Sequence, residues 1–231
     1  MSESKKSPPR RVDWRPLRIE AGSAVLDADL GLPDDPCGLV LFAHGSGSSR
    51  FSPRNRHVAG MLHAAGLATV LADLLTPAEE AVDDRTRRLR FDIALLGERL
   101  VYALDALGAA APTASLPVGL FGASTGAAAA LVAAAQRAQA VRAVVSRGGR
   151  PDLAADALPR VRAPTLLVVG GHDEPVIGMN AQAMARLACE KRLEIVPGAT
   201  HLFEEPGTLD AAGALARDWF VRHLCDRQPG A

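Results

Sequence analysis

The chain has 231 residues, of which 48% are hydrophobic and 23% are charged. That apolar fraction is ordinary for a globular core and excludes wholesale disorder, and the length suits one domain of good size or two small ones. The 26 basic and 26 acidic side chains balance to a formal net charge of zero, so no electrostatic argument favours nucleic acid or a membrane surface as a partner. No apolar run approaches the roughly 18–20 residues that span a bilayer, which excludes a transmembrane chain.

The terminal sequences and the cysteines bear on the cellular compartment in which the protein is expected. Residues 1–13 are polar and lack apolar periodicity, so we expect a flexible N-terminal tail there and a second short tail at 227–231. No apolar segment follows the basic residues of the N-terminus, which argues against a secretory signal. The three cysteines, Cys37, Cys189 and Cys225, include no CxxC pair and are interpreted as reduced thiols. We therefore expect a cytoplasmic protein.

In chain order, the pattern begins with two strands and continues as an alternation of strands and helices. Residues 15–20 and 23–30 have the alternation of a strand pair around a turn, and residues 38–43 form the continuous apolar run of a strand buried on both faces. Further strands are expected at 68–73, 117–121, 141–145, 165–169 and 192–196. Apolar residues at helical spacing predict helices at 58–65, 93–107, 126–138, 181–189 and 211–224.

This order of elements predicts a single α/β domain over residues 14–226. Two strands followed by strict alternation of strand and helix are typical of one doubly wound, mostly parallel sheet with an antiparallel start. No linker rich in proline or glycine splits the chain. In such sheets ligands bind at the carboxyl ends of the strands, so the informative residues are those that directly follow the predicted strands.

One predicted strand runs into the sequence Gly122-Ala123-Ser124-Thr125-Gly126, and an alanine-rich helix follows. A G-x-S-x-G sequence at a strand-to-helix junction is typical of a nucleophile elbow, in which a sharp turn lifts the serine clear of the sheet. The flanking glycines allow the strand and the helix to approach closely. The alternative is a glycine-rich connection in which Ser124 is an ordinary helix cap.

Asp173 and His201 each follow the end of a later predicted strand, so both are expected at the same sheet edge as Ser124. The chain order of serine, acid and histidine is that of one class of catalytic triad. His201 can accept the Ser124 proton, and Asp173 can hold the imidazole in the required tautomer. Asp152 is the competing acid, although it lies farther beyond its own strand end.

The segment His44-Gly45-Ser46-Gly47 follows the strand at 38–43. Its glycines allow the backbone to turn N–H groups towards a substrate oxygen. The N–H groups of Ser46 and Thr125 are therefore expected to form an oxyanion hole, in which each donor is typically worth about 3 kcal/mol. His44 is expected to hold the loop in place.

Together, these motifs resemble the α/β-hydrolase fold and, within it, the dienelactone hydrolase-like family of small enzymes without a cap domain. The resemblance implies an eight-stranded sheet and the hydrolysis of esters or lactones. Dienelactone hydrolases use a cysteine nucleophile, whereas this elbow carries Ser124, which favours a general serine carboxylesterase. Some hydrolases with similar stretches are fused to phosphoribosyltransferase-like domains, and no such domain is expected in this chain. The stretches that carry the resemblance are HGSGSSR (44–50), DLLTPAEE (73–80), FGASTGAAAAL (121–131), SRGGRPDLA (146–154), LVVGGHDEPV (167–176) and PGATHLF (197–203).

The predicted substrates are small, soluble carboxylic esters or lactones, cleaved through an acyl-enzyme. No long insertion follows the strand at 141–145, so no large cap is expected and the site should be open. The segment 74–90 is expected to be a loop that forms one wall of the site. Glu79 and Glu80 in this loop either approach the nucleophile or are solvated.

Arginines follow two of the strands at the expected active edge: Arg50, Arg54 and Arg147. A guanidinium binds a carboxylate or a phosphate with two parallel hydrogen bonds, so these arginines are candidates to recognise an anionic group on the substrate. The alternative is that they are solvated or paired locally.

Other functions stay open on the sequence alone. A thioesterase or an acyltransferase would use the same triad, and a noncatalytic binding protein could share the fold.

A cofactor-binding Rossmann protein is disfavoured, because the glycine fingerprint at Gly45 and Gly47 is incomplete and residues 122–126 lack the lysine of a P-loop. His57 and His63 do not share a helix face, so we expect no metal and no cofactor. We expect a monomer or a homodimer.

Overall fold

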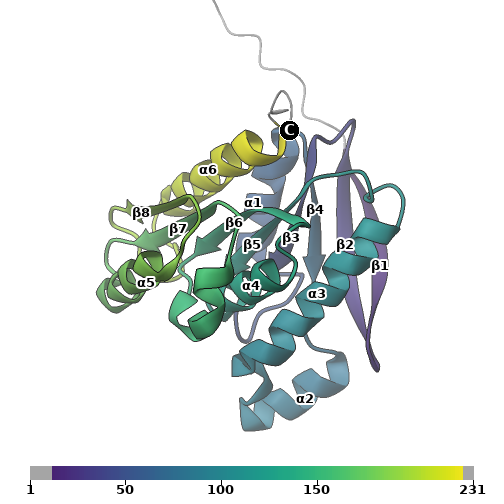
Figure 1. Cartoon of the computed structure of the whole chain (residues 1–231), viewed down its shortest axis with the longest axis horizontal. Helices are drawn as coiled ribbons and strands as arrows, with labels where there is room; N and C mark the ends of the chain where they lie inside the picture. The colour runs from purple at the N-terminus through teal and green to yellow at the C-terminus, as the bar shows by residue number, and fades with distance from the viewer. Residues whose placement is uncertain (1–11, 226–231) are drawn as a thin grey trace, which may run out of the picture.

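An eight-stranded sheet runs through the centre of the computed structural model, which describes residues 12–225 (Figure 1). The strands lie in the order β1-β2-β4-β3-β5-β6-β7-β8. The β1–β2 and β2–β4 pairs are antiparallel and all others are parallel, which confirms the expected sheet. The strands are β1 (Val12–Ala21), β2 (Ala24–Pro33), β3 (Gly38–Ala43), β4 (Leu67–Ala72), β5 (Val118–Ala123), β6 (Val141–Arg147), β7 (Thr165–Gly170) and β8 (Lys191–Val196).

Helices cover both faces of the sheet. Helices α3, α4 and α5 pack on one face, and α1 and α6 pack on the other (Figure 1). Strands β3, β4, β5 and β7 are buried along their whole length because both faces are covered, which explains their continuous apolar runs. The α-helices are α1 (Pro53–Ala64), α2 (Pro77–Thr86), α3 (Ile93–Ala109), α4 (Thr125–Gln136), α5 (Glu174–Arg186) and α6 (Thr208–Phe220). Two 3-10 helices, η1 (Leu89–Phe91) and η2 (Pro151–Arg160), and one π-helix, η3 (Val221–Cys225), complete the described helical segments.

Two stretches differ from the sequence expectations. The segment 74–90 is not a loop, because it contains helix α2, which begins at a capping box in which Thr76 and Glu79 satisfy each other's backbone N–H groups. Helix α5 begins at Glu174 and not at residue 181, because Pro175 stands in its first turn and Asp173 is its N-cap. The chain therefore turns into α5 directly after the predicted acid.

The expected tails at 1–13 and 227–231 fall on residues outside the described range, apart from Val12 and Asp13, which belong to β1. No cap domain is evident among residues 12–225, as expected. None of the helices in this range is long and apolar enough to cross a membrane.

The interpretation of all three cysteines as reduced thiols was wrong. Cys37, just before β3, and Cys225, at the end of η3, form a disulfide with a Cα–Cα distance of 5.0 Å. The two residues are 188 positions apart in the chain, so only the packing of η3 beside β3 brings them together. Cys189 is the free thiol of this range. The cysteines therefore give no support to the expected cytoplasmic location.

Candidate active site

Ser124 lies at a sharp turn between β5 and α4 with φ 50° and ψ −120°, a backbone conformation that non-glycine residues rarely adopt. The glycines on either side allow this turn. A Cβ atom at Gly122 would overlap the backbone of Ala127, and one at Gly126 would overlap the carbonyl oxygens of Ala43 and His44. The strand, the helix and the loop after β3 therefore meet closely around Ser124, as expected for a nucleophile elbow.

The three residues predicted as a triad lie within hydrogen-bond distance of one another. The Ser124 Oγ lies 3.3 Å from His201 Nε2, and His201 Nδ1 lies 2.7 Å from Asp173 Oδ2. The residues come from the ends of β5, β7 and β8, so the parallel strands deliver them to one edge of the sheet. An Nδ1–H that donates to Asp173 leaves Nε2 free to accept the serine proton.

The competing acid, Asp152, lies in a different arrangement. Its carboxylate accepts two hydrogen bonds from Arg150, at 2.9 and 2.8 Å. The geometry therefore brings Asp173, and not Asp152, to the histidine.

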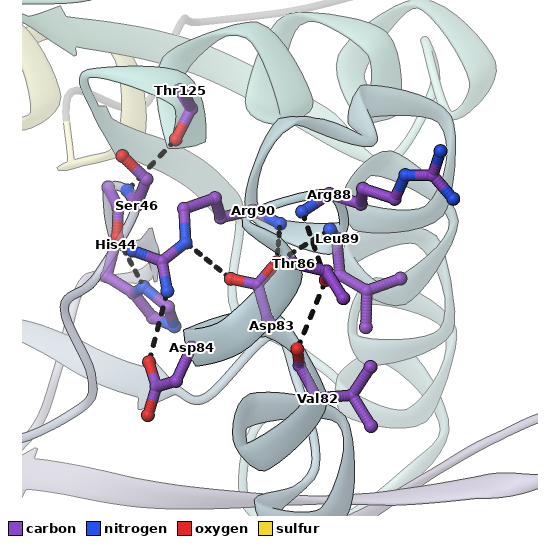
Figure 2. A network of polar contacts seen from close by, with 11 residues as sticks. His44, Ser46, Val82, Asp83, Asp84, Thr86, Arg88, Leu89, Arg90 and Thr125 are labelled. Carbon is purple, nitrogen blue, oxygen red and sulfur yellow. Dashed lines mark hydrogen bonds and ion pairs between the residues drawn. The ribbon is translucent and has the colours of Figure 1, made fainter.

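The two expected oxyanion donors differ in what they contact. Thr125 is the first residue of α4, and its N–H donates no hydrogen bond to another residue in the range 12–225. The Ser46 N–H donates to the Thr125 hydroxyl oxygen at 3.0 Å (Figure 2). The Thr125 N–H is therefore free to donate to a substrate oxygen. The Ser46 N–H can do so only after its hydrogen bond to the Thr125 hydroxyl is broken.

His44 holds the start of the loop after β3, as expected. Its Nε2 accepts the Leu74 N–H at 3.1 Å, so its Nδ1 carries the proton that is donated to the Gly45 carbonyl at 2.9 Å. Burial lowers the pKa of His44, which keeps the ring neutral and suited to this pair of bonds.

Ser124 and His201 line a cavity of about 260 Å³. Of the three candidate arginines, Arg54 and Arg147 line this cavity as well. Arg50 does not line it, because its guanidinium pairs with Asp73 and Asp29 beside the loop after β3. Sequence reasoning missed two further lining residues, Ser52 and Asn55, at the start of α1, since no motif marks them.

Arg147 is a buried cation without a carboxylate partner in the described part of the chain. Only 8% of the residue is exposed, and its guanidinium carbon lies 5.9 Å from the centre of the Phe121 ring and 5.8 Å from that of Phe203. Among residues 12–225 the guanidinium makes one hydrogen bond, from Nη2 to the Asn55 side-chain oxygen at 3.5 Å, and its Nε and Nη1 are buried without acceptors. Burial, and secondarily the charge of Arg54, lower the pKa of Arg147 to about 10.

A second cavity of about 240 Å³ lies beside the first and shares with it Gly45, Ser46 and Ser48. Glu80 contributes to its wall, together with Asp83, Asp84 and Arg90. Burial and nearby carboxylates raise the pKa of Glu80.

Glu79 lies elsewhere, because its carboxylate caps α2 and pairs with Arg99 at 2.8 Å. Neither Glu79 nor Glu80 lines the cavity that contains Ser124.

The fold and the sequence both match a known family. Residues 26–221 match the Dienelactone hydrolase family. The chain belongs to the dienelactone hydrolase family. A dienelactone hydrolase from Anabaena variabilis has a crystal structure that is 58% identical in sequence and has a TM-score of 0.91, with 92% of this chain and 99% of that chain covered.

Other relatives are less similar in structure or longer than this chain. Est1E from Butyrivibrio proteoclasticus shares the fold, with a TM-score of 0.75 at 16% identity over 90% of this chain and 98% of its own. A Mycobacterium tuberculosis protein named "Putative phosphoribosyl transferase" is 56% identical over 213 residues, which are 92% of this chain and 47% of that protein. The chain therefore spans about half the length of the curated relatives that it matches.

Proposed function

We propose that this member of the dienelactone hydrolase family is a serine hydrolase that cleaves small carboxylic esters or lactones through an acyl-enzyme. The observation that carries the proposal is the hydrogen-bonded chain from Ser124 through His201 to Asp173, with the serine on a strained elbow. A helix cap needs neither a histidine at the serine oxygen nor an acid behind that histidine. Family membership supports hydrolysis as the reaction class.

The proposed reaction has two steps. The Ser124 Oγ attacks the ester carbon while its proton passes to His201 Nε2, and Asp173 stabilises the resulting imidazolium. His201 then gives that proton to the leaving alcohol oxygen, so the carbon–oxygen bond breaks and an acyl-serine remains. A water molecule then attacks the acyl-serine while its proton passes to His201. His201 gives that proton to Ser124 Oγ as the bond between Oγ and the acyl carbon breaks, which releases the carboxylic acid and restores both residues.

The oxyanion of each tetrahedral intermediate would accept a hydrogen bond from the Thr125 N–H, which has no partner in the described part of the chain because it lies at the start of α4. The second proposed donor is the Ser46 N–H, released from the Thr125 hydroxyl when substrate binds. The positive end of the α4 dipole points at the same place and favours the developing charge.

Arg147 supports a preference for substrates with an anionic group. A buried guanidinium without a counter-ion costs free energy, and a carboxylate or a phosphate in the cavity would offset this cost. Arg54 adds a second positive charge to the same cavity, although Glu204 pairs with it at 3.0 Å. Arg50 is not part of this proposal.

A fluorophosphonate probe tests the function directly. We expect a covalent adduct on Ser124, mapped by mass spectrometry of a proteolytic digest, and no adduct in Ser124→Ala. The variant should melt at the temperature of the wild type and lose activity towards short aryl esters by about 10⁴-fold or more. An unlabelled wild-type protein would favour a noncatalytic binding protein, and acyl transfer to added alcohols or thiols in place of water would favour an acyltransferase.

A further inference from the structure

We propose that Asn55 is a specificity-determining residue: it leaves the buried charge of Arg147 unpaired and places an amide N–H beside it, so that the Ser124 cavity selects esters with a free carboxylate. The inference rests on the proposed function and deepens it by naming the residue that sets the charge of the cavity. Asn55, Arg147 and Ser124 all line this cavity of about 260 Å³.

The side chain of Asn55 has a defined orientation. Asn55 is the third residue of α1, and only 2% of it is exposed. Its Oδ1 lies 3.5 Å from Arg147 Nη2. Because a guanidinium can only donate hydrogen bonds, the amide oxygen must face Arg147 and the amide nitrogen must face away from it. Among residues 12–225, Asn55 Nδ2 donates to no acceptor, so a buried amide N–H is available to a group that enters the cavity.

No carboxylate lines this cavity in the described part of the chain. The groups on its wall that can carry a charge are Arg54, Arg147 and His201. Glu204 pairs with Arg54 at 3.0 Å, outside the cavity wall. The guanidinium of Arg147 contacts no carboxylate among residues 12–225. A carboxylate that enters the cavity therefore meets an unpaired positive charge and no negative charge on the wall.

An acidic residue at position 55 would suit the fold better than an asparagine does. It would pair with Arg147, whose charge is otherwise buried without a counter-ion. It would also stand in the first turn of α1, which has no acidic residue although a helix N-terminus favours negative charge. Asparagine has almost the shape of aspartate but no charge, so the chain forgoes both interactions. Stability forgone beside a catalytic serine is typical of a functional constraint.

The size of the cavity limits the distance between the carboxylate and the ester. Pockets for drug-sized ligands measure roughly 300–1,000 Å³, and this one is smaller. Since Asn55, Arg147 and Ser124 share it, the carboxylate can be only a few atoms from the scissile carbonyl. The substrate class that fits is the short half-esters of dicarboxylic acids.

Asn55→Asp tests the inference, because the new carboxylate neutralises Arg147 in place. Two substrates of similar shape are compared by the release of ethanol: monoethyl succinate, and ethyl 4-methylpentanoate, in which an isopropyl group replaces the carboxylate. We expect KM for monoethyl succinate to rise about 100-fold and KM for the neutral ester to stay within about threefold of the wild type. The variant should melt at or above the wild-type temperature, since Arg147 gains a counter-ion.

Three further variants separate charge, amide and general effects. Asn55→Ala removes the amide without adding a charge, so KM for monoethyl succinate should rise only about fivefold. In an Arg147→Ala background, Asn55→Asp should lower the melting temperature, because the carboxylate is then buried without a partner. Gly60→Asp is the matched control, since it adds the same charge to α1 at a position with open space around it. It should leave both KM values unchanged.

The inference is overturned if folded Asn55→Asp keeps the wild-type KM for monoethyl succinate, or if Gly60→Asp raises that KM equally. Should Asn55→Asp not fold, an unchanged KM in Asn55→Ala would overturn it as well. A wild-type enzyme that fails to react with the fluorophosphonate would instead overturn the proposed function. Weaker binding of succinate to Asn55→Asp than to the wild type, measured by calorimetry, would still support the role of Asn55.

Discussion

Ser124 and Arg147 are both held in the folded chain at a cost in free energy. Ser124 holds a left-handed backbone conformation worth about 1–3 kcal/mol of strain, and Arg147 holds a buried positive charge without an acidic partner in the described residues. Both residues line the same cavity. Strain and an unbalanced charge that coincide in one cavity are typical of a site shaped by function.

Asp173→Asn tests the acid of the proposed triad. An asparagine can hold His201 in place, but its amide favours the wrong tautomer of the imidazole, so kcat should fall by about 10³–10⁴-fold with KM little changed. The measurement is steady-state hydrolysis of an aryl ester. Asp152→Asn is the control and should retain near wild-type kcat, because Asp152 pairs with Arg150. The reverse pattern would transfer the role to Asp152.

Arg147→Ala tests the preference for an anionic substrate. The variant removes the buried positive charge, so KM should rise about tenfold or more for an ester with a free carboxylate and stay unchanged for a neutral ester of the same size. The two esters serve as internal controls for each other. Equal loss on both would show that Arg147 holds the rings of Phe121 and Phe203 in place and does not select substrates.

At the scale of elements, the site depends on strand ends and on the α2 segment. Strands β5, β7 and β8 deliver the three proposed catalytic residues to one edge, and α4 places the Thr125 N–H beside them. The α2 segment forms the wall of the second cavity, where Glu80 and Asp84 lie. Its capping box explains why a charged sequence without an apolar stripe still forms a helix.

His63 links helix α1 to strand β4 through a hydrogen bond to Thr69. Its lowered pKa predicts how the free energy of unfolding depends on pH. His63 is buried, with Nε2 at 2.7 Å from the Thr69 hydroxyl, and burial lowers its pKa to about 4. The unfolded chain therefore binds a proton at His63 between about pH 6.5 and 4 that the folded chain does not bind. The free energy of unfolding should be highest above pH 6.5 and should fall by about 2 kcal/mol towards pH 4, with screening allowed for.

Urea denaturation of wild type and His63→Gln at pH 7.5 and pH 4.5 measures this contribution. The glutamine does not titrate, so the variant should lose less stability between the two pH values than the wild type does. An equal loss in both proteins would assign the acid sensitivity to carboxylates elsewhere.

At the scale of the molecule, the Cys37–Cys225 disulfide joins the start of β3 to the end of η3. It closes a loop of 188 residues, and a long closed loop removes much conformational entropy from the unfolded chain. A reductant, or Cys225→Ser, should therefore lower the free energy of unfolding by about 3–5 kcal/mol in urea denaturation. Cys189→Ser should leave it unchanged, because Cys189 is free. Denaturation curves that coincide with and without dithiothreitol would contradict the prediction.

The sequence by itself determined the α/β class and the strand ends that carry Ser124, Asp173 and His201. These follow from local rules: apolar runs mark buried strands, and glycines around a serine mark an elbow. Those rules depend on neighbours in the chain, so they could be applied without coordinates.

Only the tertiary structure decided which of these residues meet. It brought Asp173 rather than Asp152 to His201, placed Arg147 in the cavity and Arg50 outside it, and joined two cysteines that lie far apart in the chain. The reason is physical: side-chain contacts between distant segments depend on how helices pack on the sheet, and no local pattern records that packing.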